Sequence, residues 1–314
     1  MSSPILGSII KSPLFNSPGR KILRAFAYTL PVFIRKKIIS RWRVNGSISF
    51  KINGITVNYF SNADDGIADV LYYAAETFKE YHELELFSHF SKKARTILDI
   101  GANTGIFSVI ASLSNPLAEI YAFEPYHTNA ERLKKNLALN KISNVKIINC
   151  AVGNNNEKIP FTIPAEDRVC DVLSADENFT KQFYKGHVKY INTEVEQITA
   201  DSFIEENKIK QVDLVKIDVE SYEIPVFEGM KNTLEKFSPV VICEIFVKKE
   251  RDHFYKDFLN GLGYYIYLVL PSGIVRVENL VSNPDCRNFI FSKKKTSEQY
   301  TSFKNMQVIC DELF

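Results

Sequence analysis

The sequence contains neither paired cysteines nor a long apolar run, and each absence removes a class of protein. The five cysteines are widely spaced and never form a Cys-x-x-Cys pair, which argues against a disulfide framework or a zinc site and favours reduced thiols. No segment reaches the roughly 20 apolar residues that a membrane-spanning helix needs. The apolar run over residues 25–34 is interrupted by Pro31, and no signal-peptide cleavage site follows it. We therefore expect a cytoplasmic protein.

Acidic residues are missing from the first 51 positions, which carry ten Lys or Arg, although the net charge of the chain is only +2. The remaining residues therefore sum to −8 (+2 minus +10). With so little overall charge, no global field favours binding to nucleic acid. Apolar side chains recur at helical spacing between the basic ones, which predicts a basic, partly helical N-terminal arm over residues 1–46. This arm either lies on an anionic membrane surface, at the inner face of the membrane, or packs on the main domain.

The rest of the chain reads as a hairpin and helix followed by an alternating α/β domain. Residues 47–60 alternate in polarity around Asn53-Gly54, a dipeptide that suits a β-hairpin turn, and a helix is expected over residues 69–91. From residue 95 onward, apolar strands alternate with helices, which predicts a parallel sheet covered on both faces. The expected strands cover residues 96–100, 119–123, 145–150, 213–218, 240–245, 263–270 and 286–293, and the expected helices cover 106–113, 128–140 and 224–237. The predicted divisions are 1–46, 47–94, 95–293 (the main domain) and 294–314 (a C-terminal tail).

A glycine loop follows the first strand of this domain, in the stretch TILDIGANTGIFSVIA. Gly101 and Gly105 allow the backbone to approach a ligand and to turn into a helix, whose amides could meet a carboxylate. A dinucleotide fingerprint would need glycine at Asn103, so that cofactor is disfavoured. S-adenosylmethionine (SAM) carries no phosphate and tolerates this spacing. Glu124 ends the next strand, about 20 residues downstream, where a carboxylate can accept both hydroxyls of a ribose.

Charged residues also accompany the fourth and fifth strands of the domain, where burial makes them costly unless they are paired or functional. Lys216 and Asp218 share one side of their strand, so they either form a pair that satisfies itself or contribute to chemistry. In the second interpretation Asp218 is a general base or orients the acceptor, and Glu244 is the rival base. Glu220 adds a third carboxylate, and such a group could hold Mg²⁺, although the spacing leaves the metal undecided.

Four motifs in order, TILDIGANTGIFSVIA, YAFEPYHTNAERLKKNLALN, VKIINCAVGN and VDLVKIDVESYEIPVFEGM, resemble the FkbM family of SAM-dependent methyltransferases over residues 53–246. The resemblance implies an α/β class I methyltransferase fold, a Rossmann-like seven-stranded sheet whose last strand is antiparallel. It also implies that residues 99–105 hold the methionine end of SAM, that Glu124 holds the ribose and that residues 151–153 flank the adenine. Glu76, in YYAAETF, would bind the SAM ammonium. The implied cofactor-binding set is Glu76, Asp99, Gly101, Ala102, Asn103, Gly105, Glu124, Pro125, Ala151 and Val152, and the catalytic candidates are Asp218, Glu244, Lys216 and Glu220.

The expected function is therefore SAM-dependent O-methylation of a hydroxyl group on a sugar, a glycan or a related metabolite. The family's Asp-Val-Glu-Gly motif departs to Asp-Val-Glu-Ser at Ser221, which keeps open a SAM-binding protein without turnover. The basic arm keeps open a membrane-associated enzyme that acts on lipid-linked saccharides. A nucleic-acid substrate is disfavoured, because the base-stacking Asp/Asn-Pro-Pro-Tyr motif is absent after the fourth strand. The acceptor pocket is expected to come from residues 164–193.

Overall fold

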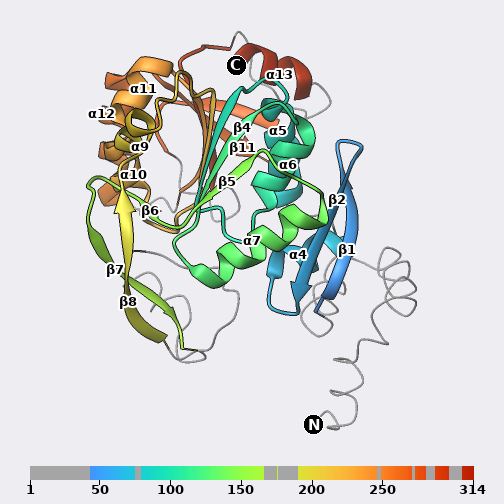
Figure 1. The fold of residues 1–314 in the computed structure, drawn as a ribbon. Helices are drawn as coiled ribbons and strands as arrows, with labels where there is room; N and C mark the ends of the chain where they lie inside the picture. The colour runs from blue at the N-terminus through green and yellow to red at the C-terminus, as the bar shows by residue number, and fades with distance from the viewer. Residues whose placement is uncertain are drawn as a thin grey trace.

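The computed structural model describes residues 43–74, 79–165, 175, 190–245, 249–270, 273–280, 287–296 and 306–314. Its centre is an eight-stranded sheet in the order β12-β11-β13-β10-β9-β3-β4-β5 (Figure 1). The strands are β3 (Thr96–Ile100), β4 (Glu119–Phe123), β5 (Val145–Ile148), β9 (Leu214–Ile217), β10 (Val240–Glu244), β11 (Tyr265–Leu270), β12 (Gly273–Val277) and β13 (Asn288–Ser292). Neighbours from β5 to β10 pair in parallel, whereas β13 is antiparallel to both β10 and β11.

Seven of these strands confirm the α/β fold expected from the sequence, including the antiparallel last strand β13. The eighth strand, β12, was not predicted. It pairs with β11 at the sheet edge, from Leu270 opposite Gly273 to Ile266 opposite Val277. The strands β3 and β4 have the predicted bounds, because most of their residues are apolar and nearly all are buried.

Helices cover both faces of the sheet (Figure 1). One face carries α5 (Lys79–Ser91), α6 (Ile106–Ser114), α7 (His127–Leu139) and α13 (Met306–Leu313), and the other carries α9 (Ala200–Glu206), α10 (Glu223–Gly229), α11 (Lys231–Phe237) and α12 (Lys249–Gly261). The predicted helix over 224–237 is two helices, because the Asp201 carboxylate accepts the amides of Asn232 and Thr233 and thereby starts α11 afresh. The predicted helix over 69–91 corresponds to α4 (Gly66–Ala74) and α5, with residues 75–78 outside the described part.

The predicted hairpin consists of β1 (Asn45–Ile52) and β2 (Ile55–Asn62). Asn53 and Gly54 both have positive φ, 47° and 79°, as a type I′ turn requires. Tyr59 of β2 and Asp65, which precedes α4, both hydrogen-bond the Thr104 hydroxyl, with Asp65 Oδ2 3.0 Å away. The hairpin therefore fixes the loop that follows β3.

A second sheet, order β6-β8-β7, extends from the domain as a ribbon and was not predicted (Figure 1). Its strands are β6 (Ala151–Val152), β7 (Lys158–Pro164) and β8 (Tyr190–Ile198). Residues 166–174 and 176–189, most of the expected acceptor pocket, lie outside the described residues, as do Glu76 and residues 1–42 of the N-terminal arm. Within the described part, no helix combines the length and the apolar character needed to cross a bilayer. The predicted domain boundaries stay predictions.

Candidate functional site

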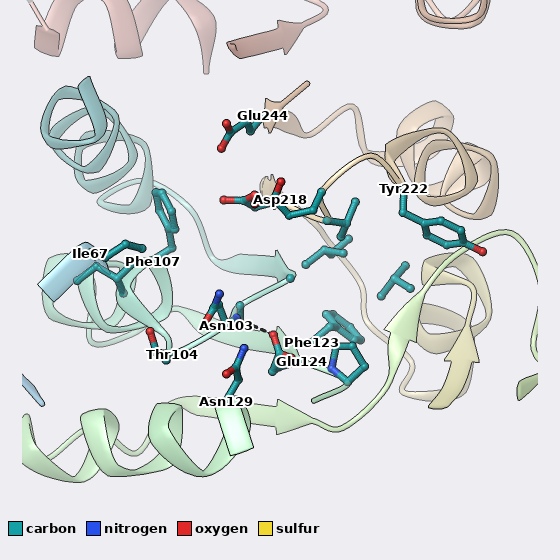
Figure 2. A pocket seen from close by; sticks show the side chains of 18 of the residues that line it. Ile67, Asn103, Thr104, Phe107, Phe123, Glu124, Asn129, Asp218, Tyr222 and Glu244 are labelled. Atoms are coloured by element: carbon teal, nitrogen blue, oxygen red, sulfur yellow. Dashed lines mark hydrogen bonds between the residues drawn. The ribbon is translucent and has the colours of Figure 1, made fainter. Parts of the chain in front are cut away.

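A cavity of about 390 Å³ opens at the carboxyl ends of β3, β4, β9 and β10 (Figure 2). Ligands of open parallel sheets bind at this edge. The residues that line it include Ile67, Val70, Leu71, Glu83, Gly101, Ala102, Asn103, Thr104, Phe107, Phe123, Glu124, Pro125, Cys150, Ala151, Val152, Asp218, Val219, Glu220, Tyr222 and Glu244. The cavity therefore collects the ends of four neighbouring strands and one wall from α4 and α5.

Both glycines of the loop after β3 have positive φ, and at each a Cβ atom would clash with a different neighbour. Gly101 has φ +81°, and a Cβ atom there would lie 1.9 Å from the carbonyl oxygen of Asp218. Gly105 has φ +89° and precedes the first residue of α6, where a Cβ would lie 2.6 Å from Leu133 Cγ. The turn into a helix is as expected. The close approach at Gly101, however, is to the neighbouring loop of the protein itself.

Most amides of this loop are used within the protein. The amides of Gly101 and Ala102 donate to the carbonyl of Phe123, that of Asn103 donates to Glu124 Oε2, and that of Gly105 donates to the carbonyl of Ala102. These four groups are therefore not available for a ligand carboxylate, and contact between the first amides of α6 and a carboxylate stays a prediction. The side chain of Asn103 and the apolar surface of Ala102 remain on the cavity wall.

Glu124 is a buried carboxylate that the backbone holds in place. Its side chain is 5% exposed, Oε2 accepts the amide of Asn103 at 2.8 Å, and Oε1 accepts the amide of Tyr126 at 2.8 Å (Figure 2). Burial raises the pKa of this carboxyl to about 7, against the lowering effect of the two amides. A carboxylate has about four acceptor sites, so each oxygen keeps capacity for one hydroxyl donor.

Asp99 is the second-last residue of β3 and is not among the residues that line the cavity. It is 1% exposed, and its Oδ2 accepts the Ser108 hydroxyl at 2.6 Å. Burial raises the pKa of the Asp99 carboxyl to about 6. Its geometry therefore suits support of the β3–α6 junction, and its predicted contact with a cofactor stays a prediction.

Lys216 is fully buried on β9 and bridges two carboxylates. Its Nζ lies 3.0 Å from Glu83 Oε1 and 3.5 Å from Asp218 Oδ2, and 4.7 Å from the ring centroid of Phe107. Burial lowers the pKa of Lys216, but the charges of Asp218, Glu83 and Glu244 outweigh it and raise the pKa above its ordinary value. Lys216 is thus a permanent cation under the cavity floor. Its pair with Asp218 exists, but the shorter contact is to Glu83.

The carboxylates beyond β9 and β10 form one acidic end of the cavity. Asp218 and Glu244 lie close together there (Figure 2), and the Asp218 side chain is 29% exposed. Burial and the charge of Asp218 raise the pKa of Glu244 to about 8. The pKa of Glu220 is also raised, by burial and by Asp218, Glu244 and Glu223. Within the described residues, no group of three or more His, Cys, Asp or Glu is arranged to hold a metal ion, so the open question of Mg²⁺ gains no support.

The opposite end of the cavity is apolar, with Phe123, Pro125, Cys150 and Val152 on its wall. Burial raises the pKa of the Cys150 thiol to about 12, so this cysteine is not a nucleophile at neutral pH. The wall therefore offers an apolar surface to a ligand. Ala151 and Val152 line the cavity and Gly153 does not, and their expected place beside an adenine stays a prediction.

Sequence reasoning brought most of its candidates to one place and missed one residue. Of the predicted set, Gly105, Asp99 and Lys216 lie beside the cavity without lining it, and Glu76 lies outside the described residues. The missed residue is Glu83 of α5, which is 4% exposed and pairs with Lys216. Its Oε2 accepts a hydrogen bond from Nδ2 of the Asn288 side chain at 2.9 Å. A buried lysine on a central strand signals such a partner but does not say where it lies in the sequence.

Comparison with known proteins gives one family. A model described as the methyltransferase FkbM domain matches residues 99–266, more than half of the chain. The chain is 24% identical over 185 residues to "Methyltransferase 1" of Beauveria bassiana, covering 56% of this chain and 74% of that protein. It is 24% identical to "Hexuronic acid methyltransferase AglP" of Haloferax volcanii, covering 46% and 53% of the two chains.

Two further matches are of the same kind. The chain is 26% identical to "2-O-methyltransferase NoeI" of Sinorhizobium fredii, covering 48% of this chain and 64% of that protein. The chain thus spans between about half and three quarters of the length of these relatives. A solved structure of methyltransferase FkbM from Methylobacillus flagellatus aligns with 15% identity and a TM-score of 0.42, over 73% of this chain and 55% of that one.

Proposed function

Because this chain belongs to the FkbM methyltransferase family and is a methyltransferase, we propose that it transfers a methyl group from SAM to a hydroxyl group of a sugar or glycan. The methyltransferase class follows from the family. The methyl donor, the acceptor and the residues that bind them are the proposal.

The observation that carries the proposal is the geometry of Glu124. Two backbone amides fix its carboxylate at the cavity wall, one on each oxygen, so the remaining acceptor sites are preorganised for a pair of adjacent hydroxyls. A ribose presents such a pair. The apolar wall of Phe123, Pro125 and Val152 beside it suits the adenine of the same nucleoside. The residues present therefore fit SAM.

The remaining length of the cavity accounts for the other end of the donor. Sheet order places the β3 loop between Glu124, which follows β4, and Asp218, which follows β9. A ligand held at Glu124 and extended along this edge would carry its methionine part past Asn103 toward the acidic end. When bound, SAM supplies an electrophilic methyl group on a sulfonium with a good leaving group. The protein's main task is then to align an acceptor, which can contribute roughly 7–11 kcal/mol.

We assign removal of the hydroxyl proton to Glu244 and orientation of the acceptor to Asp218. A carboxylate with a pKa of about 8 is a stronger base than an ordinary one and titrates near neutral pH, as a general base should. Asp218 is held by the Lys216 ammonium at 3.5 Å, which keeps its acceptor oxygens in place. The acceptor class rests on two relatives whose names refer to a hexuronic acid and to 2-O-methylation.

Calorimetric titration with SAM tests the donor assignment. The isosteric variant Glu124→Gln places an amide NH₂ against one of the two backbone donors and removes the charge. We expect a loss of about 1.5–3 kcal/mol in binding, roughly 10- to 150-fold in affinity. Glu119→Gln is the matched control, because Glu119 begins the same strand and its side chain is 47% exposed beside Lys146. Equal affinity of wild type and Glu124→Gln would refute the ribose assignment.

Turnover of methyl-labelled SAM against a panel of glycosides tests the chemistry. Glu244→Gln should lower kcat by about 10²–10⁴ and change SAM affinity far less, since a base acts in the transition state. Asp218→Asn should raise the acceptor KM more than it lowers kcat. A protein that binds SAM and methylates no member of the panel would instead support a binding role without turnover.

A further inference from the structure

The cavity has two halves that the sheet order separates. The cofactor half, defined as Glu124 together with the apolar wall of Phe123, Pro125, Cys150 and Val152, lies at β4 and beyond. The acceptor half, defined as Glu83, Asp218, Glu220, Glu244 and Phe107, lies over β9, β10 and α5. The second name rests on the proposed function, in which the methyl group is presented toward β9.

Acidic side chains dominate the acceptor half, and negative charge exceeds positive charge once Glu244 is ionised, as the proposed base must be. Four carboxyl groups face it, and among the described residues the nearby cations include Lys216, buried beneath it, and Arg287, an exposed residue whose charge lowers the pKa values of Glu220 and Glu244. If every group were ionised, the carboxylates would outnumber these two cations. The raised pKa values of Glu220 and Glu244 are the response to that crowding.

One buried carboxyl oxygen of this half, Oε2 of Glu220, also lacks a hydrogen-bond donor among the described residues. A buried carboxyl oxygen without a partner carries a desolvation cost that a hydroxyl or ammonium donor would remove. A ligand carboxylate in the place of that donor would add repulsion and supply no hydrogen for a bond.

We propose that the acceptor half selects a sugar without an anionic group, either neutral or ammonium-bearing, and discriminates against a uronate. Hydroxyl and ammonium groups donate hydrogen bonds to Asp218, Glu220 and Glu244. The carboxylate of a uronate instead meets the negative charges of Asp218 and Glu83 and, in the form of the enzyme with an ionised base, that of Glu244. Like charges juxtaposed in a binding site suppress the wrong partner. This acceptor differs from the hexuronic acid named for the Haloferax relative, which is 24% identical to this chain over 149 residues.

The test uses three ligands that differ only at C6 of a methyl hexoside: the parent alcohol, the 6-carboxylate and the 6-amino-6-deoxy compound. The set is prepared for gluco-, galacto- and manno-configured sugars, and affinity for the full chain loaded with S-adenosylhomocysteine is measured by ligand-observed NMR. We expect the alcohol and the ammonium compound to bind at least tenfold more tightly than the carboxylate. Tenfold corresponds to about 1.4 kcal/mol. The same order should appear in methyl transfer from labelled SAM.

Charge removal tells whether the acidic residues cause the preference. Glu244→Gln and Asp218→Asn should each raise the relative affinity of the carboxylate, while Glu119→Gln, at the far end of β4, should leave the ratio unchanged. Equal or tighter binding of the carboxylate would overturn the inference. So would a ratio that neither variant moves, or a chain that binds SAM and none of the nine sugars. A chain that fails to bind SAM would overturn the proposed function itself, and the calorimetric titration reports that separately.

Discussion

Replacing Lys216 by methionine probes the ion pairs beneath the cavity. The side chains of Lys216 and Glu83 are 0% and 5% exposed, and 3.0 Å separates Nζ from Oε1. Methionine keeps the length of the lysine stem and removes its charge. Glu83 would then be a buried carboxylate without its cation, although Nδ2 of the Asn288 side chain still donates to its Oε2 at 2.9 Å.

The expected magnitude follows from leaving one charge behind. Removing a single partner of a buried ion pair costs about 3–5 kcal/mol, because the surviving charge keeps its desolvation penalty. The double variant Lys216→Met/Glu83→Gln removes both charges and lets the Gln oxygen accept from Asn288. We expect it to lie within about 1–2 kcal/mol of wild type, since replacing a whole buried pair is often nearly neutral.

Urea unfolding of the wild type, the two single variants and the double variant measures the coupling in a thermodynamic cycle. The exposed pair of Lys146 and Glu119 supplies the control, with side chains 59% and 47% exposed and 2.6 Å between Nζ and Oε1. Lys146→Met should cost less than about 1 kcal/mol. A cost of Lys216→Met as small as the control's, or a double variant that merely adds the two single losses, would refute the reasoning.

The pH dependence gives a further check on the same pair. The raised pKa of Lys216 makes its contribution fully present below the ordinary lysine pKa and lost only as the pH rises through the folded value. Lys216 should therefore add no slope to stability between pH 6 and 8. In Lys216→Met the buried charge on Glu83 disappears when that carboxyl is protonated. The defect should thus be smaller at pH 5 than at pH 8.

Three further predictions concern single positions. Ser221 has φ +77°, so Ser221→Gly should stabilise the fold by about 0.5–1 kcal/mol in thermal unfolding, the relief of about 1–2 kcal/mol less the entropy cost of glycine. Gly101→Ala should cost more than about 2 kcal/mol because its Cβ meets the Asp218 carbonyl, whereas Gly54→Ala, with positive φ and open space, should cost only about 1–2. SAM affinity should rise with pH through about 7 as Glu124 ionises, while the stability of the free protein falls from pH 4.5 to 7. Glu124→Gln should abolish the rise in affinity and reduce the fall in stability, to which the raised pKa values of Asp99 and Glu244 also contribute; a flat wild-type affinity would contradict the assignment.

Sequence patterns predicted the sheet well because its strands are buried on both faces. β3 and β4 begin and end at the expected residues, and Asn53-Gly54 marked the hairpin turn correctly. β12 and the β7–β8 ribbon were missed. In the ribbon, only one residue of β8 is buried, and its antiparallel partner, β7, is more than twenty residues away in the sequence. Neither apolar periodicity nor a tight-turn signature identifies such a pair.

Two features of the candidate site depend on tertiary contacts and backbone angles that cannot be read from the sequence. Glu83 is an ordinary glutamate on a helix rich in Glu and His, and only the approach of α5 to β9 makes it the partner of Lys216. The loop after β9 shows the other case. Glu220 and Ser221 have successive positive φ values, 49° and 77°. The second value explains why the family motif Asp-Val-Glu-Gly has glycine where this chain has Ser221.

The serine at that position is better explained by geometry than by lost activity. Ser221 is 4% exposed, and its amide donates to Glu223 Oε1 at 2.7 Å, so the left-handed turn is held despite the side chain. The turn therefore still brings Asp218 and Glu220 to the cavity that Glu124 lines. Strain of this kind concentrates at functional sites, where the surrounding structure maintains it. Because Ser221 keeps the backbone path that glycine would take, the carboxylates of the motif stay in place. We therefore expect the wild-type chain to turn over SAM.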